Sequence, residues 1–437
     1  MSLVVPFTEL VQQVACSMTA PSLATFVTLV TGWVFAPRRT VTGMILAAQA
    51  VGLKHHSAYH RLFASARWSL DTVGLKLFDL ARPWVEGGEV VKLTLDDTLS
   101  RKRGLKVFGA GMHHDPLQST RKLPVLSWGL SWVVLAVVVR IPWCPERVFS
   151  LPILVRLYLN RKTAAGWGLS YRTRPELAVE LLQQLGRAHP ERRFHLVVDS
   201  AYGGQSVLGS LPLNFDLTSR MPLNARLYDP PPPRQPGTNG RPRKRGPQQP
   251  SPAQWIQQRG RRVTLELYGR RDRVRLVETQ AHWHSVPYRP LKVVVVEPLS
   301  GGRPIQAFYS TRVEQTPEQV LTDYANRWSI EEAFQGSKTH LGFEQPQSWT
   351  RKAVRRTAPM ALLLYSLIVI WFAQDGHRSY VVPPRPWYRT KTQPSFADML
   401  ATLKRESLKE EVSKHLGNRP LPRNLEAILF SSMPAGP

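Results

Sequence analysis

Two short apolar runs that end in aspartate constrain the fold of this chain most. Residues 90–95 (Val-Val-Lys-Leu-Thr-Leu) precede Asp96 and Asp97, and residues 194–198 (Phe-His-Leu-Val-Val) precede Asp199. Both runs have the composition of strands, and a helical pattern precedes the second. Strands with an intervening helix predict an α/β layered fold. Because a carboxylate at the end of a buried strand is costly unless it is paired or metal-bound, these aspartates are candidate metal ligands.

The alternation of side chains along the first run distinguishes its two aspartates. Asp96 shares a face with the polar Lys92 and Thr94, whereas Asp97 shares a face with apolar residues. This favours Asp96 as the ligand, and Asp97 stays the alternative first acid. The second motif, Asp199-Ser-Ala-Tyr-Gly, is also compatible with a simple capped turn.

A third acidic residue lies in a polar helical segment, residues 324–338. On one continuous helix, at about 100° per residue, four polar residues fall on a stripe about 60° wide: Tyr324, Arg327, Glu331 and Lys338. An adjoining, mostly apolar face is expected to pack on a sheet: Ile330, Phe334, Ser337 and Leu341. A carboxylate between cations and a phenol suits a metal beside a row of phosphates. An exposed, charged helix face is the alternative.

Two Asp and one Glu would form a set of hard oxygen ligands. Asp96, Asp199 and Glu331 suit Mg²⁺ or Mn²⁺, with water and substrate phosphate completing the coordination. Two such ions about 4 Å apart are expected to serve an in-line phosphoryl transfer by activating the attacking oxygen and stabilising the leaving oxygen.

The order of the three acids and the Tyr-x2-Arg-x3-Glu-x6-Lys pattern at 324–338 resemble the DDE transposases of bacterial insertion sequences that carry a Tyr-Arg-Glu-Lys signature. Residues 96–104, Asp-Asp-Thr and then Leu-Ser-Arg-Lys-Arg-Gly, are similar to the branch with an Asp-(Asp/Glu)-Thr first motif. In that branch the first acid of the pair is the ligand. The resemblance covers about residues 90–375.

The resemblance implies an RNase H-like catalytic core that is interrupted by a β-rich insertion. It also implies that the metal ligands are Asp96, Asp199 and Glu331. The residues that it implies near the phosphates of the cleaved DNA end are Tyr324, Arg327 and Lys338.

Composition, periodicity and the resemblance together predict five segments. Residues 1–88 have helical periodicity and are expected to form a helical N-terminal DNA-binding domain. Gly52 within it suggests a helix-turn-helix, with two packed helices and a Gly turn as the alternative. The other segments are the two core parts (89–208 and 319–376), the β-rich insertion (209–318) and a basic C-terminal region (377–437).

A Pro-rich basic loop occupies residues 228–253 within the predicted insertion. Its cationic side chains are expected to contact DNA phosphates: Arg241, Arg243, Lys244 and Arg245.

The charge balance favours a polyanionic partner. The chain has 58 Lys and Arg against 31 Asp and Glu, a formal net charge of +27, and 43% hydrophobic residues. It is therefore a folded cationic protein rather than a disordered basic tail. Double-stranded DNA, as transposon end repeats and target, is the expected partner, and two ends require a homodimer on DNA.

Several classes are not expected. Cys16 and Cys144 lie far apart, which favours a reducing cytoplasm, here bacterial and nucleoid-associated, over a disulfide framework. Charge-free stretches at 10–37, 123–139 and 357–374 are expected to be buried rather than to span a membrane. No Gly-x4-Gly-Lys-(Ser/Thr) loop occurs in the sequence, so no nucleotide cofactor is expected.

These features predict a DNA transposase that cleaves transposon ends in a metal-dependent reaction and joins them to target DNA, in cut-and-paste transposition. Two alternatives stay open. One is a domesticated, non-catalytic DNA-binding protein derived from a transposase. The other is a metal-dependent nuclease without strand transfer.

Overall fold

The computed structural model describes residues 1–85, 88, 90–120, 122–233, 243, 245–267, 270–301, 303–382 and 391–416. The chain divides into two compact units, each described here by itself. The first unit contains Met1–Glu86, Asp97–Arg172 and Ile330–Pro437, and the second contains Gly87–Asp96 and Thr173–Ser329. Strand β1 (Val90–Arg101) contributes residues to both units. The fold is mixed α/β, with a large mixed sheet and many helices, as the sequence predicted.

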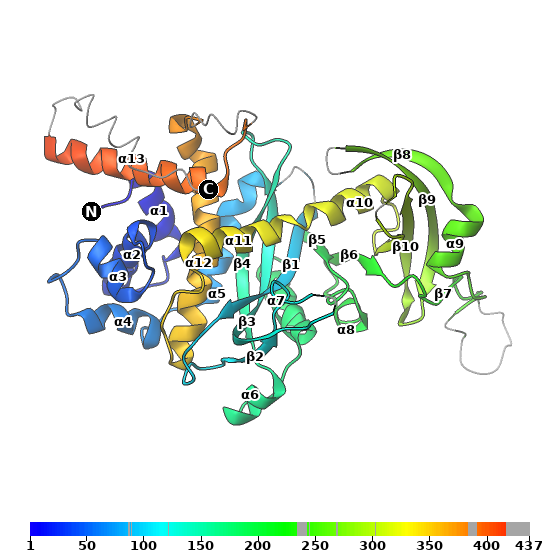
Figure 1. Ribbon diagram of the computed structural model, residues 1–437, viewed down its shortest axis with the longest axis horizontal. Helices are drawn as coiled ribbons and strands as arrows, with labels where there is room; N and C mark the ends of the chain where they lie inside the picture. The colour runs from blue at the N-terminus through cyan, green and yellow to red at the C-terminus, as the bar shows by residue number, and fades with distance from the viewer. Residues whose placement is uncertain are drawn as a thin grey trace. The chain divides into compact units, whose positions relative to one another are not determined.

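The first unit is organised around α12 (Arg351–Gln374), whose side chains are almost all buried. Four helices pack against it: α1 (Val5–Val14), α4 (His56–Ala64), α5 (Leu70–Ala81) and α13 (Phe396–Leu416) (Figure 1). Among the described helices only α12 is long and apolar enough to cross a membrane, yet 94% of its apolar window is buried in the protein. It therefore has the environment of a core helix.

The other helices of the first unit are α2 (Ala20–Phe35), α3 (Val41–Ala47), α6 (Arg161–Gly166) and α11 (Ser329–Leu341). The N-terminal region contains α1 to α5, and its predicted role as a DNA-binding domain stays a prediction. Gly52 has a φ of 83° between α3 and α4, a left-handed conformation that glycine adopts without strain.

The strands of the first unit form an antiparallel group. β3 (Leu126–Arg140) pairs with β2 (Gly111–His114) and with β4 (Val148–Tyr158), and the last part of β1 lies beside β3. Helices α5 and α12 pack on β4. The hydroxyl of Ser366 in α12 donates a hydrogen bond to the carbonyl of Pro152 in β4 at 2.9 Å.

The second unit begins with three parallel strands. The first part of β1 pairs in parallel with β5 (Arg193–Val198), which pairs in parallel with β6 (Phe215–Met221). Antiparallel strands then follow in the order β11 (Gln306–Ser310), β10 (Val286–Pro298) and β9 (Arg270–Trp283), with β8 (Arg261–Leu267) and β7 (Leu227–Tyr228) pairing with β9.

The helices of the second unit are α7 (Arg174–Ala188), α8 (Gln205–Leu208), α9 (Pro252–Arg259) and α10 (Pro317–Asn326). A capping box, Thr316 with Gln319, begins α10, as Ser/Thr at the N-cap favours. Helix α10 contacts β5, β6, β8 and β11 (Figure 1). Its Val320, Leu321 and Tyr324 join the hydrophobic core of this unit.

The prediction that the first pair of aspartates ends a strand is wrong. Strand β1 continues to Arg101, so Asp96 and Asp97 lie within it. Thr98 and Ser100 are buried in the continuation, where small polar residues alternate with more exposed ones. The charged pair suggested a strand end, but the backbone beyond it still has a partner, β3.

The prediction of one continuous helix over residues 324–338, called here the signature segment, is wrong. Helix α10 ends at Asn326 and α11 begins at Ser329, so the single-helix geometry does not relate Tyr324 to Glu331. The break consists of Arg327 and Trp328, of which only Trp is a weak helix former. The Ser329 hydroxyl also donates a hydrogen bond to the Asn326 carbonyl at 2.7 Å.

Within α11 the predicted apolar face is confirmed as buried: Ile330, Phe334, Ser337 and Leu341. On another side of the helix, a Cβ atom added at Gly336 would meet Tyr365 of α12 and Phe396 of α13. Packing of the apolar face on a sheet stays a prediction.

Candidate active site

Asp96 lies within β1, and Asp199 directly follows the neighbouring parallel strand β5. The parallel pairing of β1 with β5 ends with the pair Leu95 and Val198. The next residue of each segment is an aspartate, Asp96 and Asp199. Paired parallel strands lie about 4.8 Å apart, and residues in register point to the same face. The register therefore places the two aspartates side by side.

Helix α10 follows the polar face of β1. Lys92 Nζ lies 3.0 Å from Asp323 Oδ1, and Arg327 Nη1 donates a hydrogen bond to Asp96 Oδ2 at 2.7 Å. Lys92 and Asp96 are four residues apart on β1. Their partners, Asp323 and Arg327, are four residues apart at the end of α10. Asp96 thus lies on the face of β1 that the helix covers, in agreement with the alternation argument.

The Arg327–Asp96 pair is largely withdrawn from solvent, because the two side chains are only 11% and 18% exposed. An ion pair of this kind is stronger than one on the open surface, since less water screens it. The structure therefore connects the first acidic motif to the Arg of the signature segment through one carboxylate oxygen, Oδ2.

A structured turn follows Asp199. Its Oδ1 accepts a hydrogen bond from the Ala201 backbone N–H at 2.9 Å, and its carbonyl accepts one from the Ser219 hydroxyl at 2.9 Å. The Tyr309 hydroxyl donates to the Gly203 carbonyl in the same turn. The capped turn considered from sequence is thus present, and it fixes the orientation of the Asp199 carboxylate.

Arg220 of β6 is a candidate residue that the motifs did not reveal. It is two residues beyond Thr218, which pairs with Val197, so Arg220 is the register neighbour of Asp199. Its guanidinium lies 5.4 Å from the centre of the Tyr324 ring and is exposed. The only sequence signal is a lone arginine in residues 215–221, a run not recognised as a strand.

Tyr324 is mainly a core residue. Its ring is 9% exposed and lies 4.8 Å from the ring of Phe308, centre to centre. Burial raises the pKa of the Tyr324 hydroxyl, while Arg220 and Arg327 act in the opposite direction. The phenol therefore stays protonated beside the two guanidinium groups, and its predicted contact with phosphate stays a prediction.

A buried polar network lies on the same face, one turn of α10 earlier. Asp323 Oδ2 accepts a hydrogen bond from Gln315 Nε2 at 2.9 Å and lies 3.5 Å from His195 Nδ1. Burial lowers the pKa of His195 to about 4, so this imidazole is neutral at neutral pH. The cationic partner of Asp323 is consequently Lys92, and the network anchors α10 to β1 and β5.

Glu331 and Lys338 belong to the first unit, on α11. Glu331 is in the first turn, where a helix favours a carboxylate, and Lys338 lies seven residues later on the same side. Burial lowers the pKa of Lys338, and Glu344 partly opposes that shift. The neighbouring Glu332 instead forms an ion pair with Arg147 at 2.7 Å.

The donor chemistry of Asp96, Asp199 and Glu331 fits Mg²⁺ or Mn²⁺, because carboxylate oxygens are the ligands these ions prefer. In the part of the chain that the structure describes, no three His, Cys, Asp or Glu residues are grouped closely enough to hold a metal ion. Asp96 and Asp199 therefore supply two carboxylates as candidate metal ligands, and Arg327 donates a hydrogen bond to that of Asp96.

The basic stretch after the first motif has a structural role. Arg101 forms two hydrogen bonds with the buried Asp115, at 2.7 and 3.1 Å, which helps to hold the pKa of Asp115 at about 2. Lys102 donates to the carbonyls of Glu344 and Pro346, and burial lowers its pKa to about 8. These two cations stabilise the first unit.

The predicted basic loop is described only in part. Arg241 and Lys244 lie outside the described residues. Arg243 is exposed, whereas Arg245 lies over the ring of Tyr228 at 5.2 Å and donates a hydrogen bond to the His284 carbonyl at 3.0 Å. The DNA contacts of these four residues stay predictions.

The fold is mixed α/β, and it brings two aspartates next to each other at the ends of paired strand segments. The sequence profile of the DDE superfamily endonucleases matches residues 16–281, more than half of the chain. The chain therefore belongs to the DDE superfamily endonuclease family, whose members act on DNA and generally use divalent metals. The matched region includes Asp96 and Asp199 and ends before the signature segment. A comparison with curated proteins found no match.

Proposed function

We propose that this protein is a DNA transposase that cleaves the ends of an insertion sequence and joins them to target DNA. The observation that carries the proposal is the register of β1 and β5, which places Asp96 beside Asp199, with Arg327 from the signature segment on the same face. Paired carboxylates next to arginines are what a site needs to hold cations and phosphates together.

Asp96, Asp199 and Glu331 are the proposed ligands of two Mg²⁺ or Mn²⁺ ions, and Asp97 is the alternative first acid. When bound, these ions would polarise the phosphate and activate the attacking water or 3′-hydroxyl. Arg327, Arg220 and Lys338 would hold the phosphates of the DNA end by charge-assisted hydrogen bonds. The guanidinium groups of Arg327 and Arg220 both lie over the ring of Tyr324, at 5.7 and 5.4 Å from its centre. The turn after Asp199 would keep its carboxylate oriented.

The proposal includes an RNase H-like core. It is supported by the antiparallel β3–β4 pair, by the position of β1 beside β3, and by the parallel β1–β5–β6 pairing. The strands β8, β9 and β10 are the proposed β-rich insertion, and α3 with α4 is the proposed DNA-binding element of the N-terminal domain.

The proposed partner is double-stranded DNA, bound as two transposon ends by a homodimer in the bacterial cytoplasm. The net charge of +27 supports this choice, because arginine and lysine contacts with phosphates supply much of the affinity for DNA.

The test is a strand-cleavage assay with Mg²⁺ on a labelled duplex that carries the terminal sequence of the element. We expect the wild type to cut and join DNA, and Glu331→Ala to bind the duplex without cutting, with a rate lowered at least a thousandfold. Cleavage without joined products would instead indicate a nuclease. Binding without cleavage by either protein, with Mg²⁺ or Mn²⁺, would indicate the non-catalytic alternative.

A further inference from the structure

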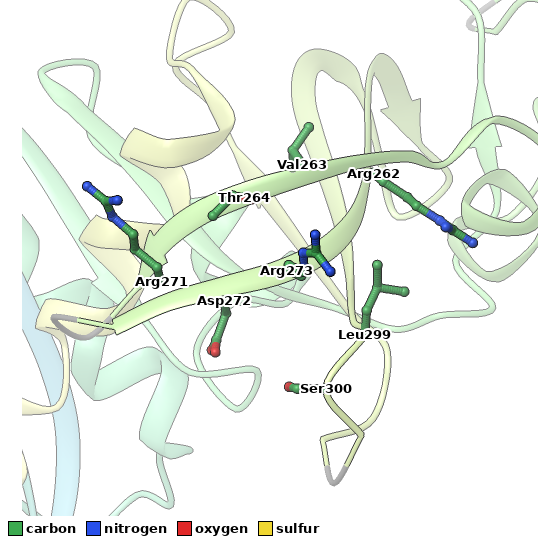
Figure 2. A pocket seen from close by; sticks show the side chains of 8 residues that line it. All are labelled: Arg262, Val263, Thr264, Arg271, Asp272, Arg273, Leu299 and Ser300. Atoms are coloured by element: carbon green, nitrogen blue, oxygen red, sulfur yellow. The ribbon is translucent and has the colours of Figure 1, made fainter.

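The hairpin of β8 and β9 in the second unit carries a second basic surface, built from residues that the proposed catalytic site does not use. Arg262, Arg271 and Arg273 line an open hollow of about 780 Å³. Figure 2 shows the three arginines on the two strands, with Leu299 and Ser300 below them in the turn after β10. We call these three residues and the hollow that they line the arginine hollow.

The register of the hairpin explains why the arginines share a face. Thr264 pairs with Arg273 and Arg262 pairs with Arg275, so alternate residues of both strands point the same way. The residues between them, Val263, Leu265 and Val274, belong to or pack against the hydrophobic core. One face of the hairpin therefore carries the apolar residues of the core together with Asp272, and the other carries the arginines, with Glu266 as the register partner of Arg271.

Other arginines of this region already have acidic partners. Arg261 pairs with Glu278, Arg275 with Glu297 and Arg303 with Asp272. By contrast, Arg262, Arg271 and Arg273 are exposed, and no acidic side chain among the described residues forms an ion pair with them. Like charges on one face of a sheet repel each other, so this cluster is costly unless an anion neutralises it.

The shape of the cluster suits a strand of phosphates. Alternate residues on a strand are about 6.8 Å apart, so Arg271 and Arg273 can reach different phosphates of one DNA strand. The guanidinium fork binds phosphate oxygens in a bidentate manner. The remaining lining is short and mixed. Thr264 and Ser300 are further hydrogen-bonding groups, and the one carboxylate, Asp272, forms an ion pair with Arg303 at 3.7 Å.

We infer that the arginine hollow binds the sugar–phosphate backbone of duplex DNA without reading its sequence. The inference rests on the proposed function only in taking DNA as the substrate. It adds a phosphate-binding site that is separate in sequence from the signature segment and from the loop at 228–253.

The test compares Arg271→Ala/Arg273→Ala with the wild type in a fluorescence-anisotropy titration of a labelled, random-sequence duplex of 40 base pairs, over a range of KCl concentrations. Each lost phosphate contact lowers the slope of log K against log salt by about 0.9. We expect the slope to fall by about 2 and the affinity at 0.15 M salt to fall by about ten- to thirtyfold. Arg271→Lys/Arg273→Lys should keep most of the slope, since charge is retained.

The matched control is Arg259→Ala/Arg261→Ala, which removes two exposed arginines of the same unit that lie outside the hollow. An unchanged slope in Arg271→Ala/Arg273→Ala, or an equal loss in the control, would overturn the inference. Circular dichroism confirms that each variant is folded. The cleavage assay with Glu331→Ala is independent of this slope, so failure of the proposed function and failure of the arginine hollow are distinguishable.

Discussion

At the scale of single residues, the contact between Arg327 and Asp96 is the most informative feature of the second unit. It joins a residue of the signature segment to the first acidic motif, 231 positions earlier in the chain. The guanidinium neutralises a carboxylate that would otherwise repel the neighbouring Asp199. Alternation along residues 92–96 was enough to predict the face of Asp96, but no pattern in the sequence predicted its partner.

The neighbouring His195 gives a prediction for pH. Burial lowers its pKa from about 6.5 to about 4. Between these values the unfolded chain binds a proton that the folded chain does not, so stability falls as the pH falls from about 6.5 to 4. Between pH 7 and pH 5 we expect His195 to remove about 2 kcal/mol of unfolding free energy.

Urea denaturation at pH 7 and pH 5 measures this effect. His195→Asn should be less stable than the wild type at pH 7, because it loses buried packing, yet it should lose less stability between the two pH values. An equal loss in both proteins would show that His195 does not control the acid response.

At the scale of elements, close packing of α5 on β4 gives a prediction for stability. A Cβ atom added at Gly74 would lie 1.8 Å from the carbonyl oxygen of Ile153, so the helix and the strand must separate. We expect Gly74→Ala to lower the unfolding free energy by about 1–3 kcal/mol, the usual cost of overpacking. The denaturation midpoint measures it.

The control for this change is Gly166→Ala, at the end of α6. A Cβ atom there meets nothing within 4 Å, so alanine should be neutral or slightly stabilising. Equal midpoints for Gly74→Ala and the wild type would contradict the tight contact between α5 and β4.

The sequence predicted elements well where the pattern was local. The apolar run 194–198 predicted β5, and the helical pattern before that run predicted α7. Strand β4 was missed because Pro152 interrupts its apolar run and disfavours a strand, although the pairing tolerates it at a register shift opposite Ala136.

Strand β6 and the helix break were missed because long-range contacts decide them. In β6, Asp216 is polar, yet it is buried because Arg193 and Arg289 pair with it. At residue 327 the helical pattern continues in the sequence, but the chain turns where Arg327 reaches Asp96. The residues in these contacts are far apart in the sequence, so the local periodicity of the sequence does not indicate them.

At the scale of the whole molecule, the net charge of +27 and the family membership point in the same direction. The family profile covers the two aspartates and most of the proposed insertion, including the three arginines of the arginine hollow. The signature segment lies beyond residue 281 and rests on its own residues. The proposed enzyme therefore combines an acidic pair, a guanidinium beside it and a cationic exterior suited to DNA.

The central claim is that Asp96 and Asp199, paired on one face of the sheet, form the metal-binding core of a DNA-cleaving site. The most direct measurement is the rate of Mg²⁺-dependent cleavage of the end duplex by Asp96→Asn, Asp97→Asn and Asp199→Asn. We expect Asp96→Asn and Asp199→Asn to lower the rate about a thousandfold or more, and Asp97→Asn to stay within about tenfold of the wild type. Full activity of Asp96→Asn or Asp199→Asn would contradict the central claim.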